Sequence, residues 1–123
     1  KLDRPMYLNL LTMYFPVTAI VSITHRITGV IVLLSLPLYL WMLDASVSSL
    51  EGFERVKDLL AHKSFLLLFW AFSAAWIFHA CSGIRHIVMD LGYGETMHAG
   101  RITSYISLVS AAVLSIMMGV WLW

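Results

Sequence analysis

Each of three long apolar stretches, residues 27–43, 64–84 and 102–123, carries no Asp, Glu, Lys or Arg. The shortest has 17 residues, which make about 25 Å of α-helix, close to the thickness of a bilayer's hydrocarbon core. Lipid cannot satisfy free backbone groups, so segments of this kind cross a membrane as helices. We therefore expect an all-α membrane protein, a single domain of residues 1–123, with transmembrane helices at about 16–43, 64–90 and 102–123.

Composition supports a membrane protein and excludes other classes. The chain of 123 residues is 60% hydrophobic and 12% charged, whereas soluble domains are about half apolar. A formal net charge of +1, without a phosphate-cradling glycine loop, gives nucleic acid no surface to bind. Cys81 is the only cysteine, so this chain alone forms neither a disulfide nor a cysteine-ligated iron–sulfur cluster. It has no C-x-x-C-H sequence, and any haem would be held without thioether links.

The segments outside the spans predict how the chain begins and turns. Residues 1–15 mix charged, aromatic and apolar side chains, which is typical of an interfacial, partly amphipathic segment. Pro16 suits the first turn of the first helix, and Asp44 is expected to end that helix. Between the first two spans we expect a short surface helix that begins with a capping box of Ser48 and Glu51. Gly92, Gly94 and Gly100 are expected to break the chain before the last span.

Charge predicts the orientation. If three helices alternate, one side of the membrane carries Lys1, Arg4, Arg26, Arg85 and Arg101. The connecting segment 44–63, on the opposite side, has four acidic and three basic residues. The positive-inside rule then places the N-terminus in the cytoplasm, or in a mitochondrial matrix.

Polar residues interrupt the first two spans at one depth. In the first span, helical spacing brings Ser22, His25, Arg26 and Gly29 onto one face. The second span contributes His79, Ser82, Gly83, Arg85 and His86. Since the two helices are antiparallel, both sets lie toward the same membrane surface. Lipid does not satisfy such groups, so we expect the chain to form a bundle with a partner subunit in a larger complex.

His79 lies within an apolar segment and admits two interpretations. Neutral imidazole is a good iron ligand, and Gly83, one turn away, leaves room for a flat porphyrin. Alternatively, His79 is only hydrogen-bonded to a neighbouring helix. Ligation by two imidazoles needs a second histidine, and no other lies deep within an apolar span. A partner chain is therefore expected to supply it.

The first-span residues also have alternatives. His25 and Arg26 either form a snorkelling pair at the membrane surface or contact haem propionates or a reduced quinone. Ser22 either bonds its own i−4 carbonyl or donates to a quinone carbonyl. Asp90, beyond the second span, either caps its helix or pairs with Arg85. We find no catalytic constellation.

Taken together, the motifs resemble a known family. They are Arg4-Pro5, Ser22-x-x-His25-Arg26-x-Thr28-Gly29 and His79-x-x-x-Gly83-x-Arg85-His86-x-x-x-Asp90-x-Gly92. This combination resembles the cytochrome b556 membrane-anchor subunits of succinate dehydrogenase, respiratory complex II, over nearly the whole chain. The segments 15–20 and 51–54 look especially like the gammaproteobacterial form.

The resemblance implies roles for particular residues. His79 matches the axial ligand of a haem b that is shared with a second membrane-anchor subunit, which supplies the other histidine. Ser22 and Arg26 match positions that line a ubiquinone pocket. His25, Arg26, Arg85 and His86 match positions at the haem propionates or the haem edge.

The resemblance also implies a setting in electron transport and the tricarboxylic acid cycle. Electrons from succinate would pass through a flavoprotein subunit and an iron–sulfur subunit to ubiquinone, and succinate would not touch this chain. Catalysis would belong to the succinate:quinone oxidoreductase as a whole. The implied location is a bacterial inner membrane, among phospholipid, with the N-terminus cytoplasmic. Two alternatives stay open: the anchor of a menaquinol-oxidising fumarate reductase, and a cofactor-free structural anchor or small transporter subunit.

Overall fold

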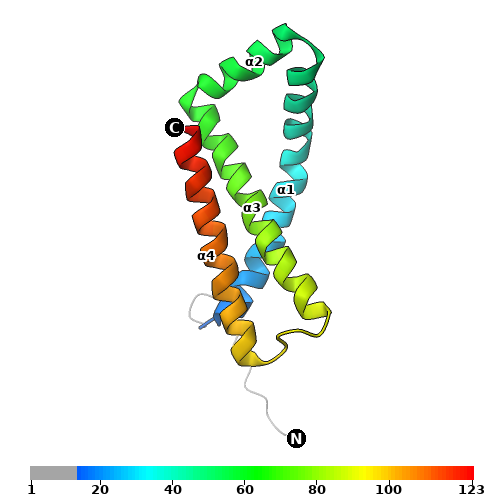
Figure 1. Cartoon of the computed structure of the whole chain (residues 1–123), viewed down its shortest axis with the longest axis vertical. Coiled ribbons are helices and arrows are strands. Elements are labelled where there is room, and N and C mark those ends of the chain that lie inside the picture. Colours follow the sequence, from blue (N-terminus) through cyan, green and yellow to red (C-terminus); the bar gives the residue numbers. More distant parts are fainter. Residues whose placement is uncertain (1–13) are drawn as a thin grey trace, which may run out of the picture.

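The computed structural model describes residues 14–123, which form four helices and no strands. The helices are α1 (Val17–Ser48), α2 (Leu50–Ala61), α3 (Lys63–Asp90) and α4 (Met97–Leu122) (Figure 1). Three of them, α1, α3 and α4, are long and apolar enough to cross a bilayer. The prediction of an all-α fold with three transmembrane helices is therefore confirmed. The interfacial segment predicted at the N-terminus lies almost entirely outside the described residues.

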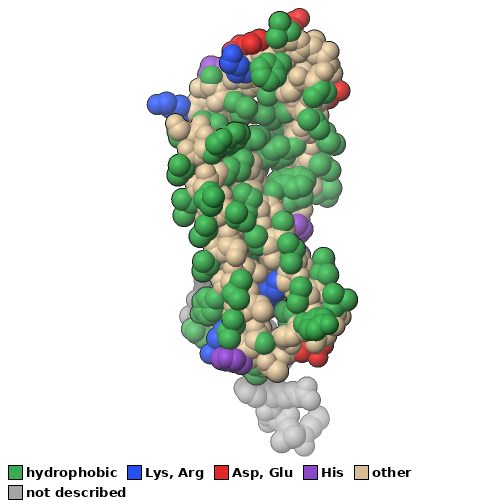
Figure 2. Space-filling model, in the orientation of Figure 1, with side chains coloured by type: hydrophobic (Ala, Val, Ile, Leu, Met, Phe, Trp, Pro, Cys, Tyr) green, Lys and Arg blue, Asp and Glu red, His purple; other side chains and the backbone are tan. Residues whose placement is uncertain are grey.

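The three long helices pack unevenly along their length. Figure 1 shows α1 and α3 crossing in the half that contains the first turns of α1 and diverging toward α2, which bridges their far ends. Helix α4 runs alongside α3 and also contacts α1. Most of the charged side chains visible in Figure 2 lie toward the two ends of the molecule, and hydrophobic side chains predominate between them. This distribution suits a bundle that crosses a membrane.

Helix α1 continues past its predicted end. It contains Pro37 and extends beyond Asp44 to Ser48. Its 32 residues make about 48 Å of helix, which exceeds the hydrocarbon core by several turns. The extra turns can lie among headgroups, where Asp44 stays solvated. The hydroxyls of Ser46 and Ser48 each donate to a carbonyl one turn back, at 2.6 Å.

The capping box predicted for Ser48 and Glu51 is wrong. Ser48 is still part of α1, and its hydroxyl donates to the Asp44 carbonyl. The N-cap of α2 is Ser49, whose side chain accepts the Gly52 N–H at 3.0 Å. Sequence alone did not distinguish two adjacent serines. The end of the preceding helix decided which one was free to cap.

Helix α4 begins five residues before the predicted 102. Thr96 is its N-cap and accepts a backbone N–H of the first turn at 3.1 Å. Gly92 and Gly94 have φ values of +87° and +74° and form the preceding turn, which side chains other than glycine rarely allow. Gly100, predicted to break the chain, instead lies buried inside α4. An added Cβ there would lie 3.8 Å from Thr18 Cγ2, an ordinary van der Waals contact with α1.

Small and hydroxyl-bearing residues fill the contacts between helices. The Trp76 indole N–H donates to the Ser35 hydroxyl at 2.9 Å, joining α3 to α1. The Trp70 indole N–H donates to the Ser115 carbonyl at 2.9 Å, joining α3 to α4. Contacts of this kind hold transmembrane helices together, because lipid is as apolar as leucine and gives helices no hydrophobic reason to associate. The buried polar side chains of the described region are Thr28, Ser35, Ser73, Ser82, Arg85, Ser104 and Ser107.

Candidate functional site

Three histidines meet where α1 and α3 cross. The His25 ring from α1 stacks on the His79 ring from α3, with centroids 4.2 Å apart and ring planes within 8°. The His86 ring, also from α3, lies 4.8 Å from the His25 ring at a tilt of 38°. We refer to His25, His79 and His86 as the histidine cluster. The polar faces predicted to meet at one depth are thus brought together at these three residues.

One nitrogen of His79 is held by α1. Its Nδ1 lies 3.1 Å from the backbone carbonyl oxygen of His25 and 3.4 Å from Thr28 Oγ1. A carbonyl oxygen only accepts hydrogen bonds, so we assign the imidazole proton to Nδ1. The lone pair is then on Nε2. An imidazole held in this way is the usual form of a histidine that binds a metal.

Three buried polar atoms near the crossing have no hydrogen-bond partner within residues 14–123. They are His25 Nε2, His86 Nε2 and Ser82 Oγ. Ser82 is fully buried and lies on α3 between His79 and His86. Buried polar atoms are nearly always paired in native proteins. The cluster is therefore incomplete within the described chain and has hydrogen-bonding capacity for a group from outside it.

Two glycines leave space around the cluster. An added Cβ at Gly29 would lie 3.0 Å from His79 Cε1, and one at Gly83 would lie 3.5 Å from His25 Nε2. Gly83 remains the glycine predicted to leave room for a porphyrin, and the glycine that lies against the His79 ring is Gly29. Thr28, known from the sequence only as part of a motif, also contacts His79. Gly29, one turn beyond His25, was already part of the predicted polar face of the first span, whereas Thr28 was not.

The residues predicted to bind a quinone lie beside the cluster on α1. Ser22 is half-buried and Arg26 is exposed. They are four residues apart, hence one turn apart on a shared face. No hydrogen bond joins either side chain to the cluster in the described region.

Arg85 lies on the other side of α3. It is only 7% exposed, and its guanidinium donates from Nε to Thr103 Oγ1 at 3.2 Å and from Nη2 to the Gly100 carbonyl at 3.3 Å. Both partners belong to α4. Asp90 is exposed, and the alternative in which it pairs with Arg85 is not seen among the described ion pairs. The structure thus joins His86 to the cluster and Arg85 to α4.

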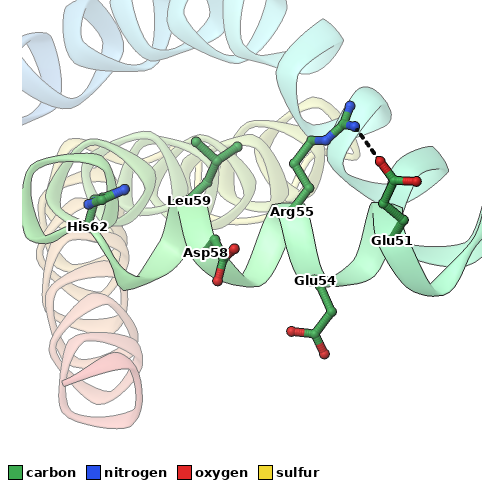
Figure 3. Close-up of a pocket in the computed structure, with 6 residues that line it drawn as sticks. All are labelled: Glu51, Glu54, Arg55, Asp58, Leu59 and His62. Carbon is green, nitrogen blue, oxygen red and sulfur yellow. Dashed lines mark hydrogen bonds and ion pairs between the residues drawn. The ribbon is translucent and has the colours of Figure 1, made fainter.

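A separate cavity of about 370 Å³ lies on α2, at the opposite end of the molecule. Figure 3 shows its side chains spread along the helix, with Arg55 bonded to Glu51 while Glu54 and Asp58 point elsewhere. Across residues 14–123, no three His, Cys, Asp or Glu side chains are grouped to hold a metal ion. We assign no site to this cavity.

These features define a class: small helical membrane proteins with three spans and a histidine cluster where two of them cross. Comparison with known proteins narrows the class. A family model described as the succinate dehydrogenase/fumarate reductase transmembrane subunit matches residues 1–118. The chain therefore belongs to this family, as the motifs indicated.

Individual relatives agree with the family model. The chain is 39% identical over 121 residues to the succinate dehydrogenase cytochrome b556 subunit of Coxiella burnetii, covering 98% of this chain and 97% of that protein. It is 32% identical over 111 residues to the corresponding subunit of Rickettsia typhi, covering 89% and 86%. For that of Paracoccus denitrificans the identity is 29% over 116 residues, covering 94% and 88%. The resemblance to cytochrome b556 subunits, including a gammaproteobacterial one, is confirmed.

Proposed function

We propose that this chain is the haem b- and ubiquinone-binding membrane anchor of a succinate:ubiquinone oxidoreductase. One observation carries the proposal: His79 Nδ1 is held 3.1 Å from the His25 carbonyl oxygen. This contact leaves His79 Nε2 as the atom with a free lone pair. Membership of a family whose members are named as cytochrome b556 subunits supplies the cofactor class.

The residues at the crossing fit a haem. His79 Nε2 is a suitable axial ligand, and the stacked His25 ring covers the face of His79 rather than its Nε2 edge. The buried Nε2 atoms of His25 and His86 have no partner within residues 14–123 and suit propionate oxygens. Haem b, when bound, supplies a one-electron redox centre. The second axial histidine would come from a second membrane-anchor subunit.

We assign the remaining haem contacts as follows. Arg26 is exposed one residue after His25, and a guanidinium there would neutralise a propionate through charge-assisted hydrogen bonds. Arg85 is assigned to the haem edge on family resemblance alone, because its hydrogen bonds within the chain go to α4. This chain binds and orients the cofactor, and it holds no residue that we propose as catalytic.

Ubiquinone would bind beside the same face of α1. The Ser22 hydroxyl would donate to a quinone carbonyl, and Arg26, one turn away, would stabilise negative charge as the quinone is reduced. The half-buried position of Ser22 and the exposure of Arg26 support this assignment. Both residues lie in the half of α1 that contains the histidine cluster.

The setting follows from the same proposal. Residues 1–123 would form one anchor domain that binds the iron–sulfur subunit, which in turn carries the flavoprotein subunit where succinate is oxidised. The N-terminus would face the cytoplasm of a bacterial cell, since Arg26, Arg85 and Arg101 lie toward that end. Phospholipid of the inner membrane would cover the apolar surface seen between the charged ends in Figure 2.

The test is a dithionite-reduced minus oxidised optical spectrum of the purified complex, with the native chain and with His79→Ala. We expect a b-type band that is lost or strongly altered in the variant. His62→Ala, which changes an exposed histidine after α2, is the matched control and should keep the native band. An unchanged band in His79→Ala would remove the ligand from this position. Absence of a band from the native complex would favour a cofactor-free anchor.

A further inference from the structure

The orientation of His79 depends on one turn of α1. In an α-helix, the carbonyl of residue i accepts the N–H of residue i+4, so the His25 carbonyl and the Gly29 amide belong to the same hydrogen bond within α1. His79 Nδ1 approaches this same carbonyl oxygen to 3.1 Å. The imidazole therefore lies against the backbone of α1 directly beside Gly29.

Gly29 makes this approach possible because it has no side chain. An added Cβ would lie 3.0 Å from His79 Cε1, 3.6 Å from Nδ1 and 3.9 Å from Nε2. The edge of the ring that joins its two nitrogens thus occupies the space that any side chain would need. To make room, the imidazole must move away from α1 by a few tenths of an ångström. Such a shift takes a 3.1 Å contact to the edge of hydrogen-bonding range or beyond it.

Thr28 provides a second oxygen at the same place. It is 7% exposed, and its Oγ1 lies 2.9 Å from the Thr24 carbonyl and 3.0 Å from the His25 carbonyl. The hydroxyl proton is directed to one of these helix carbonyls. A lone pair of Oγ1 is then available to His79 Nδ1 at 3.4 Å. One N–H of His79 is accordingly placed between two acceptors on α1.

We infer that Gly29 is a positioning residue for the axial ligand, and that it acts together with Thr28. Its bare backbone lets the His25 carbonyl hold Nδ1–H, and this contact sets the direction in which Nε2 faces the iron. The inference rests on the proposed function of His79. Partners of this kind, which contact the non-ligating nitrogen, make the imidazole a stronger donor, and their loss typically weakens metal binding about ten- to a hundredfold.

The experiment compares native complex with Gly29→Ala. The measurements are haem content after extended dialysis, the haem midpoint potential by redox titration, and the largest g value in electron paramagnetic resonance. We expect haem to be retained about ten- to a hundredfold less tightly. We also expect the midpoint potential to rise, because an imidazole without its Nδ1 acceptor donates less to oxidised iron.

Gly119→Ala is the matched control. An added Cβ at Gly119 would lie 3.1 Å from Trp70 Nε1, so this glycine is packed as tightly as Gly29 but against the opposite end of α3. We expect Gly119→Ala to lower thermal stability and to leave the haem potential and g value unchanged. A shift as large as that of Gly29→Ala would indicate a general packing effect and would overturn the inference.

A second pair of variants keeps the test decisive if Gly29→Ala does not assemble. Thr28→Val keeps the shape of the side chain and removes Oγ1, whereas Thr28→Ser keeps the hydroxyl. We expect a raised midpoint potential in Thr28→Val and a native value in Thr28→Ser. A native potential and g value in Thr28→Val, with Gly29→Ala either unassembled or native-like, would overturn the inference and leave the proposed function intact. A native complex without a b-type band would instead overturn the proposed function.

Discussion

Helix α3 packs against both α4 and α1, and these two interfaces differ in whether their buried polar groups are hydrogen-bonded. Against α4, the donors and acceptors are matched within the chain. From α3, Trp70 donates to the Ser115 carbonyl at 2.9 Å and Arg85 to the Gly100 carbonyl at 3.3 Å. Within α4, the Ser104 hydroxyl donates to the same Gly100 carbonyl at 2.7 Å. Ser104 is fully buried, yet its hydroxyl is satisfied. Within residues 14–123, none of the buried side-chain atoms that lack a hydrogen-bond partner belongs to α4.

At the crossing of α3 with α1, some buried polar atoms have no hydrogen-bond partner within the described residues. His79 is held through Nδ1, but His25 Nε2, His86 Nε2 and the nearby Ser82 hydroxyl have no partner in the described region. An unpaired polar atom away from water costs about 1–3 kcal/mol, and a membrane supplies no water to relieve it. The comparison therefore separates an interface whose buried side chains are paired within the chain from one that leaves hydrogen-bonding atoms free for a ligand or a partner subunit.

The largest expected effect comes from His86→Leu. Whether this change stabilises or destabilises the complex should depend on whether haem is bound. In a His79→Ala background, the loss of an unpaired buried nitrogen should stabilise the complex by about 1–3 kcal/mol, seen as a higher midpoint of thermal unfolding. In the native background, the same change should make haem easier to remove. Destabilisation in both backgrounds would show that His86 Nε2 has a permanent protein partner. The two interfaces of α3 would then not differ in the pairing of their buried polar groups.

Two buried serines test the same difference between the interfaces, with smaller expected changes in stability. Ser82 and Ser104 are both fully buried on the bundle interior, but only Ser104 has a hydrogen-bond partner among the described residues. Ser104→Ala should lower stability by about 1 kcal/mol, whereas Ser82→Ala in the His79→Ala background should leave it unchanged or raise it. Thermal unfolding of the two variants, side by side, measures the difference. Equal losses would mean that both hydroxyls are satisfied in the assembled complex.

The smallest effect is expected outside both interfaces. Arg55 and Glu51 form an ion pair at 3.1 Å on α2 (Figure 3), with side chains 63% and 84% exposed. Because water screens such pairs, Glu51→Gln should change stability by less than about 0.5 kcal/mol. The same unfolding assay should therefore barely register it. A loss as large as that of Ser104→Ala would mean that this end of the molecule is buried by another subunit.

Much of the architecture was predictable because hydrocarbon tolerates few sequences. Uncharged runs of bilayer length predicted α1, α3 and α4, and helical spacing predicted that His25 and His79 belong to faces that meet. Helix ends were less predictable. Asp44 does not end α1, Ser49 rather than Ser48 caps α2, and Gly100 lies within α4. These choices depend on which backbone groups are already paired and on how closely a neighbouring helix approaches.

The same division applies at the candidate site. The sequence indicated His79 as a candidate site residue, because ionisable side chains are energetically costly within an apolar span and usually have a function there. The role of Gly29 did not, since a glycine in a membrane helix is equally consistent with ordinary packing. Arg85 and His86 are adjacent and seemed to serve one site, but their directions on α3 differ by about 100°. One contacts α4, and the other contacts His25.

By itself, the sequence determined that this chain is an all-α membrane protein of three spans, with polar residues at one depth in two of them. Local composition and spacing suffice for that, because insertion into a bilayer depends on each segment separately. Only the tertiary structure decided that the His25 carbonyl receives His79 Nδ1, that Gly29 leaves room for it, and that Arg85 bonds to α4. Those outcomes depend on how two helices cross, and the crossing is set by close packing between residues far apart in the chain.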